Sequence, residues 1–205
     1  MTTPTATITL AITGASGMPY AMRLLECLLR AECRVYVVYS QAAQVVAKQE
    51  LEITLPTSSS EAQHYLAQRF AARDGQLRVF GRDEWFAPVA SGTNPADAMV
   101  VCPCTMGTLA AIAGGMSDNL IERAADVMLK ENRKLILVPR ETPFSAIHLE
   151  NMLKLARLGV TILPANPGFY HKPQAVADLV DFVVARVLDH LGVAHQLLPR
   201  WGEDK

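Results

Sequence analysis

Hydrophobic residues along the chain gather in two kinds of segment that alternate. Short runs rich in β-branched and aromatic residues predict buried strands, at Thr7–Thr13, Arg34–Tyr39, Ala98–Cys102, Lys134–Val138 and Val160–Leu163. Longer segments with apolar residues at helical spacing predict helices, over Met18–Ala31, from about Thr105, over about Ser145–Leu158 and over about Gln174–Leu191. This alternation is typical of β-α-β units.

Strands that alternate with helices favour a parallel sheet covered on both faces, because right-handed crossovers place helices on either side. We therefore predict an α/β fold, a Rossmann-like (flavodoxin-like) three-layer αβα sandwich with a mostly parallel sheet. Residues 51–91 are less regular, but Ser58–Ser60 can cap a helix that runs to about Arg73, and Leu77–Phe80 has the pattern of a short strand. We expect one domain over residues 1–205, with a flexible N-terminus at about 1–6 and a C-terminal tail or lid at about 192–205.

Composition narrows the class of protein. Half of the residues are hydrophobic and 19% are charged, which favours a homo-oligomer that buries surface between subunits. Nineteen Lys and Arg against twenty Asp and Glu leave no basic surface for nucleic acid or an anionic membrane. No signal peptide or membrane span is evident, and the four cysteines lack the spacing of a disulfide framework, so we expect a cytoplasmic protein.

Metal chemistry has little support in the sequence. Cys102-Pro103-Cys104 suggests a zinc site, but no second pair of ligands follows, which favours two buried apolar cysteines. The five histidines have no paired spacing, so neither a metal site nor a Ser-His-Asp triad is expected.

Candidate ligand-binding residues follow the ends of the predicted strands, where open α/β sheets bind their ligands. The first group is Gly14-Ala15-Ser16-Gly17, where glycines allow close approach and the next helix offers free N–H groups to a phosphate. An ordinary tight turn explains this group as well. The second strand ends at Tyr39-Ser40 without an acidic residue for a ribose, so a mononucleotide is favoured over a dinucleotide.

Three further groups carry hydroxyl, cationic or aromatic side chains. Thr105-Met106-Gly107-Thr108 opens a helix and can face a phosphate or a flavin ring, or Thr105 simply caps that helix. Arg123 and Lys130 share a helical face and can converge with Arg140-Glu141, although solvated side chains and an Asp126–Lys130 pair are the plainer explanation for the first two. Tyr170 is a ligand contact or a packed loop anchor, and Arg186 and Trp201 taken singly suggest surface and packing roles.

Taken in order, these segments resemble the UbiX family of flavin prenyltransferases over nearly the whole chain. The resemblance is carried by the GASG turn, Ser40, Glu50, PCTMGTLAAIAGG, NLIERAADVMLKE, LVPRETPFS, PANPGFY and the tryptophan near the end. It implies that a dimethylallyl group passes from dimethylallyl monophosphate to N5 of reduced FMN, with ring closure at C6 and no metal. It also implies a homododecamer, and a product used by UbiD-type decarboxylases, as in ubiquinone biosynthesis.

The resemblance also implies roles for single residues. FMN is expected to be held by Gly14, Ala15, Ser16, Ser40, Thr105, Met106, Gly107, Thr108 and Arg140, and the prenyl phosphate by Arg123, Lys130, Arg140, Glu141, Tyr170, Arg186 and Trp201. A catalytic set is expected at Ser16, Glu50, Lys130, Glu141 and Tyr170, in which fixed cations neutralise the departing phosphate and carboxylates move protons.

Two alternatives remain beside this interpretation. An FMN-dependent cysteine decarboxylase resembles the same fold, but VCPCTMGT stands where that family has its own motif. A non-enzymatic FMN carrier is expected only if the charged cluster is solvated. Gly107 stands where relatives often carry lysine, so a charge is missing from that loop.

Overall fold

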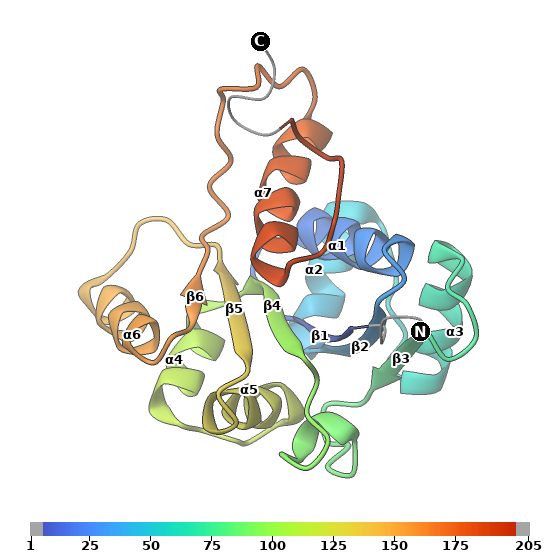
Figure 1. The fold of residues 1–205 in the computed structure, drawn as a ribbon, viewed down its shortest axis with the longest axis vertical. Coiled ribbons are helices and arrows are strands. Elements are labelled where there is room, and N and C mark those ends of the chain that lie inside the picture. The colour runs from blue at the N-terminus through green and yellow to red at the C-terminus, as the bar shows by residue number, and fades with distance from the viewer. Residues whose placement is uncertain (1–5, 200–205) are drawn as a thin grey trace.

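The computed structural model describes residues 6–199, and within them one parallel sheet organises the chain (Figure 1). The sheet has six strands in the order β3-β2-β1-β4-β5-β6, and every neighbouring pair is parallel. The chain builds outward from β1 to β3, crosses back, and builds outward again from β4 to β6. The switch point of this topology therefore lies between β1 and β4.

The strands are β1 Thr7–Ile12, β2 Arg34–Tyr39, β3 Leu77–Phe80, β4 Ala98–Cys104, β5 Lys134–Pro139 and β6 Thr161–Ile162. The helices are α1 Met18–Arg30, α2 Gln41–Leu51, α3 Ser59–Phe70, α4 Met106–Gly114, α5 Leu120–Lys130, α6 Ala146–Arg157 and α7 Val176–Leu191, with a 3₁₀ turn, η1, at Pro88–Ala90.

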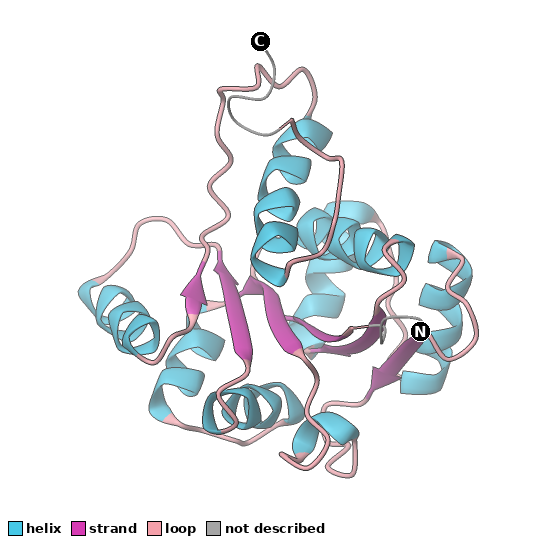
Figure 2. Ribbon diagram, viewed as in Figure 1, coloured by secondary structure: helices cyan, strands magenta, loops and turns pink. Residues whose placement is uncertain are grey.

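Each face of the sheet carries its own hydrophobic core, because successive side chains of a strand point to opposite sides. Ile8, Leu10 and Ile12 of β1 join the core beneath α1, α2, α3 and α7. Ala11 joins the core beneath α4, α5 and α6. Figure 2 shows the resulting layers, with helices on both sides of the magenta strands.

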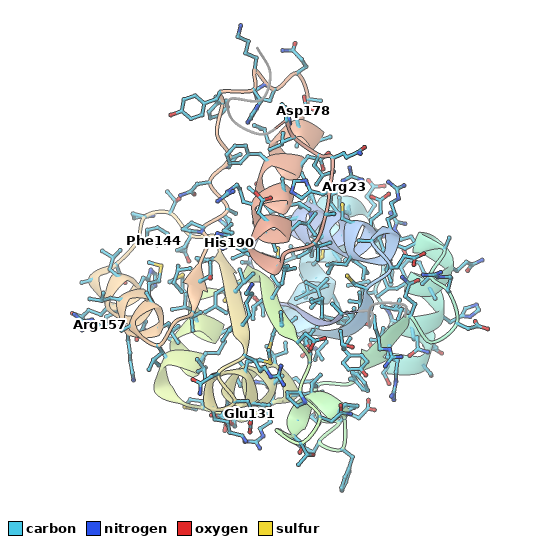
Figure 3. The ribbon with its side chains drawn as sticks, in the orientation of Figure 1. Arg23, Glu131, Phe144, Arg157, Asp178 and His190 are labelled. Atoms are coloured by element: carbon cyan, nitrogen blue, oxygen red, sulfur yellow. The ribbon has the colours of Figure 1, made fainter. Side chains whose placement is uncertain are left out.

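Helices α1 and α7 are joined by an ion pair on the first face. The guanidinium of Arg23 donates to both carboxylate oxygens of Asp181, at 2.7 Å from Nε and 3.0 Å from Nη2. These hydrogen bonds, together with one to Glu26, raise the pKa of Arg23 above its ordinary value. Arg23 lies beside α7 in Figure 3, and the pair fixes α7 against the body of the domain.

The predicted fold class is confirmed, and the sheet is entirely parallel. Most predicted elements are present with ends shifted by one or two residues, but the sequence pattern missed α2. Only Ala43 and Ala47 of that helix are buried, so its sequence carries little helical periodicity. Strand β4 continues through Pro103 to Cys104, two residues beyond the predicted end, with an irregular ladder to β5 between Val101 and Cys104.

The segment between β6 and α7 leaves the carboxyl end of the sheet. Figure 1 shows it rising beside α7, well above the strands. Gly168 in this segment lies so close to α7 that a Cβ there would stand 2.9 Å from Cζ of Phe182. We call residues 164–175 the arm. Its close packing on α7 explains why glycine follows proline in the PANPGFY sequence.

Candidate active site at the carboxyl edge

Thr13 fastens the switch point between β1 and β4. Its backbone N–H and its hydroxyl both donate to the carbonyl of Pro103, at 3.2 and 2.8 Å. The same hydroxyl oxygen accepts the backbone N–H of Thr105 at 2.8 Å. The GASG turn after β1 and the start of α4 after β4 are therefore held in one fixed relation.

The two glycines of the GASG turn are required for different reasons, Gly14 for packing and Gly17 for its backbone conformation. A Cβ at Gly14 would stand 2.3 Å from the Cβ of Ala42, so this position has to be glycine for α2 to pack here. Gly17 has φ of 124°, a conformation that other residues rarely adopt. Close approach at Gly14 therefore serves the neighbouring helix, whereas the sequence left open a ligand or an ordinary tight turn.

Glu50 occupies the N-terminus of α1. Its carboxylate accepts the backbone N–H of Gly17 at 3.0 Å and that of Met18 at 2.8 Å. The positive end of the helix dipole favours a negative group at this point. The prediction that these N–H groups are free to bind a phosphate is therefore wrong: a carboxylate of the chain itself already holds them.

Two N-cap residues place hydroxyl groups at the same edge of the sheet. Ser40 follows β2 and accepts the N–H of Ala43, which starts α2. Thr105 follows β4 and accepts the N–H of Thr108 at 3.1 Å while it donates to the Thr108 hydroxyl at 3.0 Å. Between Thr105 and Thr108, Met106 is buried and Gly107 is exposed. The first turn of α4 therefore presents polar groups at the carboxyl edge of the sheet.

Arg140 reaches across β4 to the GASG turn. It directly follows β5, and its Nε donates to the carbonyl of Ser16 at 3.3 Å. Glu141 lies beside it and accepts the N–H of Thr142 at 3.1 Å. The structure therefore brings together the residues that were predicted to hold FMN at the ends of three strands, namely Gly14, Ala15, Ser16, Thr105, Met106, Gly107, Thr108 and Arg140, with Ser40 at the end of a fourth.

Arg123 and Lys130 lie elsewhere in the subunit. Asn119 caps α5 by accepting the N–H groups of Ile121 and Glu122, which places Arg123 in the first turn. Arg123 donates from Nε to the carbonyl of Ala90 at 3.0 Å. Lys130, at the other end of α5, has its Nζ 2.7 Å from where a Cβ of Gly92 would stand.

Within one subunit the structure thus gives Arg123 and Lys130 other contacts than Arg140 has, and their convergence on one phosphate stays a prediction. The two cations share a helical face, as predicted, but that face contacts Ala90 and Gly92, in the segment before β4. In Figure 3, Glu131, which follows Lys130, lies in the lower part of the view, whereas Phe144, in the loop that follows Arg140, lies near the upper end of β5.

The expected ion pair on α5 is also different. Asp126 pairs with Arg123 at 2.8 Å, not with Lys130. Lys130 pairs instead with the neighbouring Glu131 at 2.6 Å. Because Arg123 lies one turn before Asp126, it meets the carboxylate as readily as Lys130 does one turn after it.

Tyr170 and Arg186 line one pocket above the sheet. This pocket has a volume of about 540 Å³ and lies between the arm, α7 and residues 193–199. His171 and Phe182 form part of its wall, with their ring centroids 6.1 Å apart. Arg186 is half-exposed and pairs with Asp189 at 2.7 Å. Trp201, predicted to join this group, lies outside the described residues.

The cysteines of the Cys-Pro-Cys sequence are buried on opposite faces of the sheet. Cys102 belongs to the core beneath α1 and Cys104 to the core beneath α4. Burial raises the pKa of Cys102 to about 12 and raises that of Cys104 as well.

Within residues 6–199, no three His, Cys, Asp or Glu side chains are grouped to hold a metal ion. No described helix is long and apolar enough to span a membrane.

Sequence reasoning missed two residues at this edge. Thr13 carries the hydrogen bonds that join the two halves, and its position just before Gly14 was the available signal. Tyr20 stands close to Gly17. Burial, followed by the neighbouring Cys102 and Glu50, raises the pKa of its phenol.

Comparison with known proteins shows the family of this chain. The family model described as Flavoprotein matches residues 2–188. A flavin prenyltransferase UbiX from Pseudomonas aeruginosa is 59% identical over 196 residues, which cover 96% of this chain and 94% of the relative. A flavin prenyltransferase UbiX from Methanocaldococcus jannaschii is 48% identical and covers 95% and 98% of the two chains.

This chain belongs to the UbiX family of flavin prenyltransferases. The predicted enzyme class, a flavin prenyltransferase and therefore a transferase, is thereby confirmed. A crystal structure of AnUbiX (PadA1) in complex with FMN and dimethylallyl pyrophosphate matches with a TM-score of 0.86 at 39% identity, over 98% of this chain and 100% of that one. The family model and the FMN of that complex therefore both agree with the predicted flavin cofactor.

Other solved structures extend the comparison. A dodecameric FMN-dependent UbiX-like decarboxylase from Escherichia coli O157:H7 matches with a TM-score of 0.83 at 41% identity, over 95% of this chain and 98% of that one. The FMN-dependent cysteine decarboxylase TvaF matches at 19% identity with a TM-score of 0.58, which shows a shared fold alone. The cysteine decarboxylase alternative is therefore not favoured.

Proposed function

We propose that this UbiX family member transfers the dimethylallyl group of dimethylallyl monophosphate to N5 of reduced FMN and then closes a ring at C6. The supporting observation is the hydrogen bond from Arg140 to the carbonyl of Ser16, which gathers the predicted flavin residues around the switch point. The allylic C–O bond breaks with its electron pair on phosphate, and the reduced flavin supplies the nucleophilic nitrogen and the ring carbon.

The groups at the switch point suit a flavin mononucleotide. Ser40 and Thr108 offer hydroxyl groups, and the first turn of α4 offers backbone N–H groups to a phosphate or a ring carbonyl. Arg140 is exposed and donates one hydrogen bond to the residues that the structure describes, so further guanidinium N–H groups can face a ligand. The phosphate of FMN is proposed to bind at these groups, since Glu50 occupies the start of α1.

The leaving phosphate requires fixed cations, because negative charge grows on it as the C–O bond breaks. Arg140 lies at the carboxyl edge, but Arg123 and Lys130 of the same subunit cover the segment before β4. We therefore propose that a neighbouring subunit contributes Arg123 and Lys130, and that Tyr170 and Arg186 reach the same phosphate from the arm and α7. A homo-oligomer, a dodecamer as in the Escherichia coli relative, would supply these neighbours.

Proton transfer is proposed for three side chains. Glu141 stands next to Arg140 and is positioned to exchange a proton with the phosphate. Ser16 and Glu50 flank the turn at which the flavin is proposed to lie, and they are assigned the proton balance at N5. Tyr170, with Trp201, would stabilise allylic cation character and exclude water.

A mass measurement tests the proposed reaction. The protein is incubated without oxygen with reduced FMN and dimethylallyl monophosphate, and the flavin is weighed by mass spectrometry. We expect a flavin heavier by one dimethylallyl group and an equal amount of inorganic phosphate. An unchanged flavin would reject the proposal and favour a carrier, whereas carbon dioxide released from a cysteinyl substrate would favour the decarboxylase.

Mixed oligomers test the contribution of neighbouring subunits. Arg123→Ala and Arg140→Ala each remove one proposed cation, so each variant alone should be nearly inactive. If the two side chains act in one site from different subunits, co-assembly of the variants restores part of the activity. No recovery in verified mixed oligomers would place both residues in the same subunit's site or in none.

The product and its place in the cell are part of the proposal. Prenylated FMN would pass to a UbiD-type decarboxylase, and the enzyme would act in the cytoplasm. Comparing decarboxylase activation by the released product and by the protein itself would test this transfer.

A further inference from the structure

Asp189 on α7 holds two side chains at once, one with each carboxylate oxygen. Its Oδ2 accepts from Nη1 of Arg186 at 2.7 Å. Its Oδ1 accepts from Nε2 of His195 at 3.0 Å. Arg186 and Asp189 lie three positions apart on the helix, whereas His195 lies in residues 193–199, beyond the end of α7. One carboxylate therefore links the helix to the segment that follows it.

The hydrogen bonds of His195 indicate which ring nitrogen faces Asp189 as a donor. The backbone N–H of Leu197 donates to Nδ1 at 3.3 Å, so this ring nitrogen carries a lone pair. A neutral imidazole then has its hydrogen on Nε2, which is the nitrogen that faces Asp189. The His195 side chain is 14% exposed, whereas the Asp189 side chain is 44% exposed, so water reaches the contact mainly from the carboxylate. The link needs no positive charge on histidine.

The linked residues form one side of the pocket described above. Arg186, Asp189 and His195 all line it, and Tyr170 of the arm lies on the same wall. The segment after α7 also returns against the arm farther along, since Leu197 and Leu198 share a second cavity with Gly168 and His171. Movement of residues 193–199 would thus open the pocket at which Arg186 stands.

We propose that Asp189 is a positioning residue: it fixes the guanidinium of Arg186 for the substrate phosphate and holds residues 193–199 over the same pocket through His195. The inference rests on the proposed function of Arg186 as a phosphate ligand. A guanidinium has five N–H donors, and among residues 6–199 Asp189 takes one of those of Arg186, which leaves others to bind an anion. A side chain held in place loses less conformational freedom when the phosphate binds.

The negative charge of Asp189 has an opposing effect, because it repels the phosphate. Two contacts reduce this repulsion: the cationic Arg186 and the N–H of His195 already engage both oxygens of the carboxylate. Positioning is therefore expected to outweigh repulsion. The sign of the effect on substrate affinity separates the two possibilities.

The test compares Asp189→Asn with wild type and with Glu61→Gln, which removes an exposed carboxylate on α3. We expect Asp189→Asn to raise KM for dimethylallyl monophosphate about fivefold, the upper effect of an exposed ion pair, with kcat within about twofold. Glu61→Gln should change neither constant. An unchanged or lower KM in Asp189→Asn would overturn the positioning role.

A double variant shows whether Asp189 acts through Arg186. If it does, Asp189→Asn raises KM less in the Arg186→Ala background than in wild type, because only the link to His195 is left to lose, and fully additive effects would contradict the inference. If Arg186→Ala leaves KM unchanged, the proposed phosphate role of Arg186 fails and the inference fails with it. If Arg186→Ala raises KM but Asp189→Asn does not, the inference alone fails.

Amide hydrogen exchange of the full-length, flavin-free protein provides a readout that does not depend on activity. We expect Asp189→Asn and His195→Ala to speed exchange in residues 193–199 by at least about fivefold, with α1 unchanged. Exchange in that segment at the wild-type rate in both variants would show that the carboxylate does not hold it.

Discussion

Replacing Glu50 by alanine should loosen the turn between β1 and α1. In the native protein, the Glu50 carboxylate accepts the N–H groups of Gly17 and Met18 at 3.0 and 2.8 Å, and alanine leaves both donors without it. A hydrogen bond to a charged group contributes about 1.5–3 kcal/mol, and a negative group at a helix N-terminus about 0.3–1 kcal/mol. Because Glu50 is half-buried and water can partly replace it, we expect a loss of about 2 kcal/mol.

Thermal unfolding measures this loss. For a chain of this size, about 2 kcal/mol lowers Tm by about 4–8 °C. Flavin-free protein at one fixed concentration is required, since ligand binding and assembly both shift Tm. Gln49→Ala is the matched control, because Gln49 is exposed on α2, the helix that carries Glu50. It should leave Tm within about 1 °C of wild type. If Glu50→Ala matched that control, the carboxylate would not be holding the start of α1.

Three shorter predictions concern packing and ionisation. Gly14→Ala should lower Tm and weaken FMN binding, because its Cβ would lie 2.3 Å from a side-chain atom of α2; Gly107→Ala, whose nearest such neighbour is 3.9 Å away, should keep the wild-type Tm. Burial raises the pKa of Cys102 to about 12, so at pH 8 only about one thiol in ten thousand is ionised; native protein should leave Cys102 unlabelled by a disulfide reagent that labels it in denaturant, and rapid native labelling would refute its burial. Hydrogen bonds from the N–H groups of Gln174 and Ala175 lower the pKa of the Asp178 carboxyl below its ordinary 3.8. The ionised carboxylate therefore contributes its full stabilisation of the fold above pH 3.8 and loses it as the pH falls through the lower pKa of the folded state. The Tm difference between wild type and Asp178→Asn should shrink as the pH falls through that range, and a difference independent of pH would argue against this account.

The sequence was sufficient for the fold because its strands are continuous apolar runs with clear ends. It was insufficient for α2, whose few buried alanines give no periodic signal. The predicted end of β4 came too early, because a proline usually argues against a strand at its position. In the structure, the carbonyl of Pro103 still accepts a hydrogen bond from Thr13, so the strand continues.

The candidate site was predictable as a set of residues but not as an arrangement. Residues after β1, β4 and β5 lie together because parallel strands end at one edge, and that rule needs no side-chain detail. The hydrogen bonds of Glu50 depend on the unpredicted α2, so the occupied start of α1 was missed. Arg123 and Lys130 were placed on one helical face correctly, but helical spacing does not say which segment of the chain that face contacts.

A structure of the assembled protein with FMN and dimethylallyl monophosphate tests the central claim most directly. That claim is that cations from separate parts of the polypeptide, and from neighbouring subunits, surround one phosphate beside the flavin. We predict nitrogen–oxygen distances of about 2.7–3.2 Å from Arg140, Arg186 and a neighbour's Arg123 to the same phosphate. The claim would be contradicted if the phosphate were bound but Arg123 and Lys130 of every subunit lay more than about 10 Å from it, because salt screens charges at that distance.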